Sequence, residues 1–155
     1  MRLSELAKPN EERNGYYYAE TYPLSLLSFD TKQILQDLSK APKRRIVSPY
    51  YNSDIAYGSH GFNSMRKDSE YKITNGQYEI KNLDPHSLIS DQQFVWTISI
   101  LKMIRDPLLG IKDKNLYDRY SVVQQIDGKN YLLNGNHRAV AALYSNRSIQ
   151  CMCVN

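Results

Sequence analysis

A short turn in the last quarter of the chain carries the residue types best suited to phosphate chemistry. It reads Asn134-Gly135-Asn136-His137-Arg138 and leads into an alanine-rich segment. Gly135 allows a sharp turn, and the first N–H groups of a following helix, together with its dipole, attract an anion. Arg138 offers a planar guanidinium for two phosphate oxygens, and His137 can donate a hydrogen bond or transfer a proton near neutral pH. The turn predicts a phosphate-binding site formed by Asn134, Gly135, Asn136 and Arg138.

The elements that must position this turn are short and local. Tyr120 to Ile126 and Lys129 to Leu133 are joined by Asp127-Gly128. This dipeptide favours a β-hairpin, because the turn that matches strand twist needs positive φ at both central residues. The second strand of the hairpin then runs into the turn. Ala139 to Leu143 predicts a short helix, and Ser148 to Val154 predicts a closing strand.

Upstream of the hairpin, the pattern predicts one more strand and a longer helix. Gln77 to Leu83 alternates like a half-buried strand, and Asp84-Pro85 marks a turn after it. Ser90 or Asp91 can cap a helix that runs from about Gln92 to Arg105. We expect this strand and helix to pack with the hairpin in one sheet-and-helix core.

The first half of the chain, residues 1–75, is expected to be an extension that packs on a core formed by residues 76–155. It is rich in tyrosine and reads as irregular, apart from a helix around Ile34 to Leu38. Pro49 to Ser69 has the composition of a long loop, and long loops in small domains often carry function. We therefore expect this loop to border the site as a lid, with His60 as a proton-transfer candidate.

Composition places the chain among ordinary globular domains. Of its 155 residues, 41% are apolar and 23% are charged, and no stretch approaches the roughly 20 apolar residues of a membrane span. Met1 to Asn10 lacks a signal-peptide pattern, so a cytoplasmic protein with no membrane partner is expected. The net charge of +4 permits nucleic-acid contact, although basic and acidic residues are interspersed. Cys151 and Cys153 are expected to be free thiols, and their spacing from the histidines predicts no metal site.

The segment Leu133 to Ala142, within its hairpin, helix and closing strand, resembles the ParB/sulfiredoxin superfamily. Ile80 to Leu88 and Asp91 to Val95 are similar to the strand-and-turn and the glutamine-bearing helix start of ParB-like domains in bacterial toxins. Asn136 stands where a sulfiredoxin needs its nucleophilic cysteine, so the resemblance is to a stand-alone ParB-like domain of the toxin or nuclease type. It implies an α+β fold, a small mixed sheet with packed helices and an irregular N-terminal extension.

The resemblance implies an enzyme that acts on phosphate esters, most concretely a nuclease of a bacterial toxin or phage-related system. Arg138 and the helix N-terminus would neutralise charge on the scissile phosphate, and His137 would act as acid or base. Glu79 and Asp84 are the nearest candidate bases or ligands for a divalent metal. The resemblance also implies that Gln93 contributes to the phosphate-binding site.

Two other functions stay open at this stage. A nucleotide-binding phosphotransferase or triphosphatase would use the same turn to hold ATP or CTP. A non-enzymatic binder would use the tyrosine-rich half to contact a protein or single-stranded nucleic acid. DNA, RNA and free nucleotide present the same phosphate, and a toxin would also bind an immunity protein, so the substrate and the partner stay open.

Overall fold

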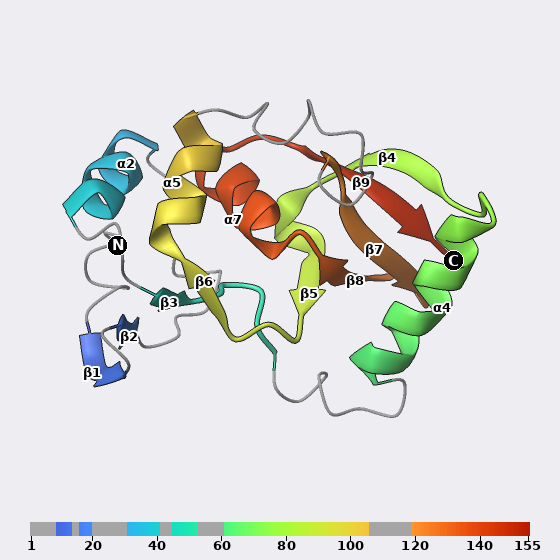
Figure 1. Ribbon diagram of the computed structural model, residues 1–155. Coiled ribbons are helices and arrows are strands. Elements are labelled where there is room, and N and C mark those ends of the chain that lie inside the picture. The colour runs from blue at the N-terminus through green and yellow to red at the C-terminus, as the bar shows by residue number, and fades with distance from the viewer. Residues whose placement is uncertain (1–8, 14–15, 20–30, 41–44, 53–60, 106–118) are drawn as a thin grey trace.

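The hairpin predicted around Asp127-Gly128 lies in the middle of a mixed sheet in the computed structural model, which describes residues 9–13, 16–19, 31–40, 45–52, 61–105 and 119–155. Among these residues the sheet has five strands in the order β4-β9-β7-β8-β5 (Figure 1). Asp127 has φ 51° and Gly128 has φ 75°, as the tight turn requires. The strands are β4 (Glu79–Leu83), β5 (Leu88–Ser90), β7 (Ser121–Ile126), β8 (Lys129–Asn134) and β9 (Ile149–Val154).

The sheet combines two antiparallel and two parallel pairings among the described strands. β7 pairs antiparallel with β8 and parallel with β9, while β4 pairs antiparallel with β9 and β5 pairs parallel with β8. The expected strands over 77–83, 120–126, 129–133 and 148–154 are thereby confirmed. The molecule is α+β, with a small mixed sheet and packed helices.

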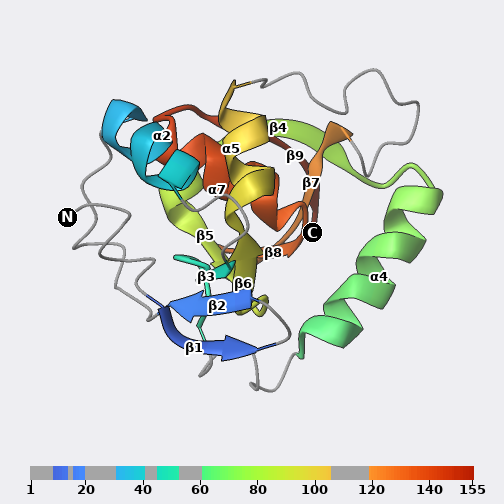
Figure 2. The ribbon, with the colours of Figure 1, turned by 60° about the vertical axis from the view of Figure 1, so that its left-hand side comes forward.

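Helices cover both faces of the sheet (Figure 2). α5 (Thr97–Arg105) and α7 (Asn136–Tyr144) pack against each other on one face, with α2 (Thr31–Lys40) beside α5. α4 (Phe62–Thr74) lies on the other face, against β7, β8 and β9. Because successive side chains of a strand point to opposite faces, Val123 and Leu132 join the α5–α7 side while Val122 and Leu133 join the α4 side.

The two C-terminal thiols also follow the alternation of side chains along a strand, because they are two residues apart in β9. Cys151 and Cys153 are buried and free, and both belong to the core cluster on the α5–α7 side. Burial raises the pKa of the Cys151 thiol to about 12. The expectation of two thiols on one face of the last strand is confirmed, and both act as small core residues.

The helix expected from Gln92 begins later, at Thr97. Phe94–Trp96 instead form β6, which pairs antiparallel with β3 (Arg45–Val47). These are aromatic and β-branched residues, which suit a strand, and their partner lies about fifty residues earlier in the chain. The predicted start was wrong because only this distant pairing decides between strand and helix.

The loop expected from Pro49 to Ser69 is also corrected. Its second part belongs to α4, whose Phe62, Met65, Ser69 and Ile73 are buried at helical spacing. The lid hypothesis does not hold for this part, because the helix is packed on the sheet. His60 lies outside the described residues. The helix expected around Ile34 to Leu38 is confirmed as α2.

Two small elements complete the description of the chain. β1 (Pro9–Arg13) pairs antiparallel with β2 (Tyr16–Ala19), and η2 (Pro85–Ser87) is a single 3-10 turn after β4. Among the described residues, no helix combines the length and the apolar character that crossing a membrane requires.

Leu132→Ala tests the central strands. Leu132 is 0% exposed between β7 and the helices, so the substitution should lower the free energy of unfolding by about 2 to 5 kcal/mol. Tyr71→Ala is the matched control, because Tyr71 is 68% exposed on α4 and its loss should cost less than about 0.5 kcal/mol. Urea unfolding measures both, and equal effects would contradict this packing.

Candidate functional site

The turn between β8 and α7 depends on a close approach to β7. Gly135 has φ 80°, and a Cβ at this position would lie 2.4 Å from Ser121 Oγ and 2.8 Å from Ser121 Cα. The Ser121 hydroxyl donates a hydrogen bond to the Gly135 carbonyl at 2.9 Å. Glycine is therefore required at this position both for its backbone conformation and for the space beside β7.

Asn134 stabilises the turn but does not cap the helix. Its Oδ1 accepts a hydrogen bond from the Gly135 N–H at 2.8 Å. Gly135 is the N-cap residue of α7, and no side chain makes a capping bond there. The Asn134 side chain is exposed at the rim of the turn.

The Asn136 side chain points into the protein. It is 4% exposed, and its Oδ1 accepts a hydrogen bond from the Ser90 hydroxyl at 2.6 Å. The buried Tyr50 hydroxyl donates to the Ala139 carbonyl at 3.0 Å, and burial raises the Tyr50 pKa well above its ordinary value. The first turn of α7 is thus tied to β5 and to the segment after β3. Asn136, expected to bind phosphate, holds the helix in place.

His137 is bound to the backbone of β6. The Trp96 N–H donates to His137 Nε2 at 2.9 Å. An amide N–H can only donate, so Nε2 is unprotonated and the neutral ring carries its proton on Nδ1. The ring is half-buried, and burial lowers its pKa from 6.5. His137 is therefore arranged as a hydrogen-bond donor through Nδ1, and its Nε2 lone pair is already used.

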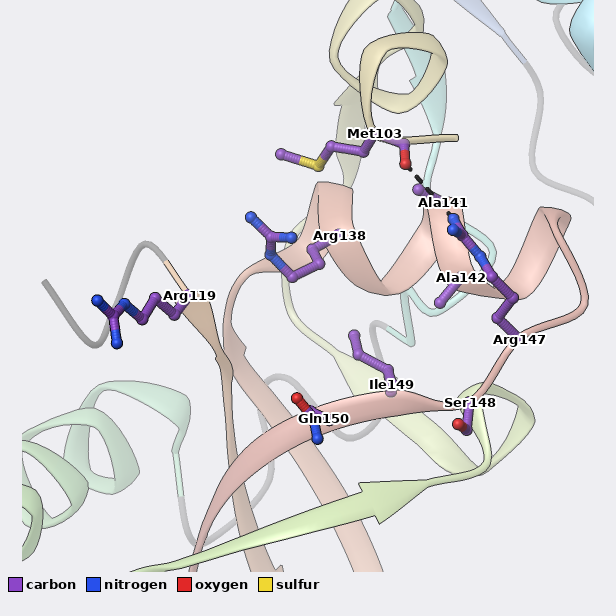
Figure 3. Close-up of a pocket in the computed structure, with 9 residues that line it drawn as sticks. All are labelled: Met103, Arg119, Arg138, Ala141, Ala142, Arg147, Ser148, Ile149 and Gln150. Atoms are coloured by element: carbon purple, nitrogen blue, oxygen red, sulfur yellow. Dashed lines mark hydrogen bonds between the residues drawn. The ribbon is translucent and has the colours of Figure 1, made fainter. Parts of the chain in front are cut away.

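Arg138 lines a pocket of about 170 Å³ together with Arg119 and Arg147 (Figure 3). We call this pocket the arginine pocket. Arg138 comes from α7, Arg147 from the turn after α7, and Arg119 from the residues before β7. Arg147 donates to the Met103 carbonyl at 3.4 Å and to Ser145 Oγ at 2.6 Å. The remaining lining residues are Met103, Ala141, Ala142, Ser148, Ile149 and Gln150.

Sequence patterns do not identify Arg119 and Arg147 as site residues. The parallel pairing of Ser121 with Cys151 places the residues before β7 beside the start of β9. Arg119 and Arg147 therefore line the same pocket, on opposite sides of it, only because β7 and β9 are neighbours in the sheet (Figure 3). Arginine guanidinium groups are suited to anions with several oxygens, such as a phosphate, and three arginines line this pocket.

The structure does not bring the other expected residues to this pocket. Glu79 is exposed on β4, where Lys81 Nζ lies 3.8 Å from its carboxylate. Asp84 is exposed at the other end of β4. Its pKa is lowered mainly by the hydrogen bond from the His86 amide and next by the hydrogen bond with the His86 ring. Gln93 is exposed, and its carbonyl accepts the Ser48 N–H at 2.8 Å. None of these residues lines the arginine pocket.

Arg66 is a further residue that no sequence pattern indicates. Its guanidinium pairs with both carboxylate oxygens of Asp91, with Nη1 2.8 Å from Oδ2. Its Nε also donates to the Leu133 carbonyl at 3.2 Å. Arg66 therefore links α4 to the last residues of β8, just before the turn. Asp91, expected as a helix cap, takes part in this ion pair.

Comparison of the chain with protein-family models, with curated proteins and with solved structures gives no match. Within the described residues, no group of three His, Cys, Asp or Glu side chains is placed to hold a metal ion.

Gly135→Ala tests the close approach of the turn to β7. Strain at positive φ and the clash with Ser121 should together lower the free energy of unfolding by about 2 to 5 kcal/mol. Gly76→Ala is the control, since Gly76 has φ 73° but a Cβ there would meet no described atom within 4 Å. Gly76→Ala should cost only about 1 to 2 kcal/mol. Urea unfolding measures both variants, and equal losses would contradict the close approach of Gly135 to Ser121.

His137 should make stability depend on pH. Because its folded pKa lies below 6.5, the unfolded chain takes up the proton first, so stability is full above that pH and falls below it. His137→Gln keeps a neutral side chain and should flatten this fall. Urea unfolding between about pH 7.5 and about pH 5 measures the difference. His86→Gln is the control for an exposed histidine, and an identical pH profile of His137→Gln and the parent would contradict the assignment.

Proposed function

We propose that this protein is a phosphate-ester enzyme, most specifically a nuclease, that binds a phosphate of nucleic acid in the arginine pocket. The observation that carries the proposal is that Arg119, Arg138 and Arg147, from separate segments, line one small pocket. The strand-turn-helix order and the resemblance of residues 133–142 to ParB-like domains support the same class. The proposed role in a bacterial toxin or phage-related system follows from that resemblance alone.

The small size of the pocket favours a phosphate group over a whole nucleotide. Pockets for drug-sized ligands span roughly 300 to 1,000 Å³, whereas the arginine pocket has about 170 Å³. The phosphate would enter the pocket while the sugar and base lie outside it. Negative charge that develops on the phosphoryl oxygens would then lie in a pocket lined by arginines, and stabilisation of such charge is the main way a site accelerates phosphoryl transfer.

His137 has a narrower role in this proposal than a general base. Its Nε2 accepts the Trp96 N–H, so the proton on Nδ1 is the group that it offers to a ligand. A neutral N–H donor stabilises a phosphate oxygen without competing with the arginines for charge. His137 precedes Arg138 in α7 but does not line the arginine pocket, so in this proposal its Nδ1 would reach a part of the ligand outside the pocket.

A nucleotide-binding phosphotransferase or triphosphatase is the second candidate. The volume of the arginine pocket also accommodates the terminal phosphate of a free nucleotide such as ATP or CTP, so the volume does not separate the two candidates. Turnover of nucleoside triphosphates with no cleavage of DNA or RNA would select this candidate over the nuclease.

Arg138→Ala tests the proposal. It should lower cleavage of labelled nucleic acid by about 100-fold or more, as expected for loss of a charged donor to the reacting phosphate. Arg138→Lys keeps the charge but not the planar fork and should lower cleavage by about 10-fold. Binding of inorganic pyrophosphate, measured by calorimetry, should weaken in the same order.

Lys102→Ala is the matched control for this series. Lys102 is an exposed cation on α5 outside the lining of the arginine pocket, so its loss changes the net charge equally. Thermal melts establish that each variant is folded. Unchanged cleavage and unchanged pyrophosphate binding in folded Arg138→Ala would refute the proposed function.

A further inference from the structure

A cation and two aromatic rings form a stack on the β3–β6 pair. The guanidinium carbon of Arg45 lies 4.8 Å from the Phe94 ring centroid and 5.1 Å from the Trp96 ring centroid. Arg45 is the cross-strand partner of Trp96, and Phe94 shares a strand face with Trp96 because the two are two residues apart. All three side chains are half-buried. We call them the Arg45 stack.

The Arg45 stack faces away from the main core. Val95, between the two aromatic residues, is 0% exposed and belongs to the core, as does its cross-strand partner Ile46. The strand alternation therefore turns the apolar residues inward and the stack outward. Core packing alone accounts for Ile46 and Val95, but it does not require an arginine across the two rings.

The Arg45 stack is linked to the proposed phosphate site through the start of α7. The Trp96 N–H is bonded to His137, and the next residue of α7, Arg138, lines the arginine pocket. One helical turn thus connects a surface suited to flat rings with a pocket suited to phosphate.

Nucleobases bind to proteins by stacking on aromatic rings and on arginine guanidinium planes. Alternation of stacking surface and phosphate pocket matches the alternation of base and phosphate along a nucleic-acid strand. In a duplex the bases are already stacked on each other, so only an unpaired base can reach such a surface. The positive charge of Arg45 also favours a polyanionic strand over an apolar peptide.

We propose that the Arg45 stack holds an unpaired base of single-stranded nucleic acid whose neighbouring phosphate enters the arginine pocket. This inference rests on the proposed function and narrows its substrate to a single strand.

Trp96 provides a direct optical test, because it is the only tryptophan in the chain. The full chain is titrated with single-stranded oligothymidylate, with an abasic phosphodiester chain of the same length, with a duplex, and with inorganic pyrophosphate. Tryptophan fluorescence should be quenched by oligothymidylate and not by the abasic chain, the duplex or pyrophosphate. Oligothymidylate should also bind about 10-fold more tightly than the abasic chain, as for one base–aromatic stack.

Arg45→Lys and Phe94→Leu test the two kinds of contact. Arg45→Lys keeps the charge and removes the guanidinium plane, and Phe94→Leu keeps the apolar character and removes one ring. Each should weaken oligothymidylate binding by about 10-fold and leave binding of the abasic chain and of pyrophosphate unchanged. Arg105→Lys is the control, because Arg105 is exposed on α5 and donates to Ser39.

The outcomes separate this inference from the proposed function. Equal affinities for oligothymidylate and the abasic chain, or equal quenching by duplex and single strand, would overturn the stacking inference while pyrophosphate binding to the arginine pocket stands. Absence of pyrophosphate binding in the parent protein would overturn the proposed function itself. The comparison of ligands on the parent chain decides the question even if a variant fails to fold.

Discussion

The contact between Gly135 and Ser121 is the constraint on which the site depends. A strand end, a tight turn and a helix start meet there, and the backbone of β7 leaves no room for a side chain on the turn. The Ser121 hydroxyl holds the Gly135 carbonyl, which also accepts the Ala139 N–H in the first turn of α7. This geometry directs α7 back over the sheet, so that Arg138, at the start of the helix, lines the arginine pocket (Figure 3).

Polar groups in the first turn of α7 have two kinds of role. Most of them hold the helix in place, whereas Arg138 lines the arginine pocket. Asn136 and the Ala139 carbonyl are bonded to Ser90 and Tyr50, and the His137 ring is bonded to the Trp96 amide. These bonds satisfy buried polar groups that would otherwise destabilise the fold. They also connect α7 to two segments from earlier in the chain, so any movement of the helix start is coupled to β5 and β6. Arg138 is the member of this turn that lines the pocket.

The distribution of charge supports the same division. On the α4 side, Arg66 is paired with Asp91 and bound to the Leu133 carbonyl, so its charge is compensated and serves to hold the end of β8. On the α7 side, none of the residues that line the arginine pocket is acidic. The net charge of the chain is only +4, and this value does not indicate that three arginines line one pocket. The proposed anion binding would depend on the placement of these arginines and not on the total number of basic residues.

Local patterns in the sequence determined the hairpin, the glycine turn, the helix after it and the closing strand with its two thiols. Each of these follows from residues that are near neighbours in the chain, such as Asp127-Gly128, whose conformational preference needs no distant partner. The same local patterns indicated Arg138 but not Arg119 and Arg147, which line the same pocket only through the parallel pairing of β7 with β9. Tertiary structure also decided that Phe94–Trp96 form a strand, because β3 supplies the missing hydrogen bonds from the first half of the chain. It decided the state of His137 as well, since the Trp96 amide selects the tautomer. Contacts between residues that are far apart in the sequence leave no periodic pattern in it. For that physical reason, only the folded chain shows the arginine pocket and the roles of the residues around it.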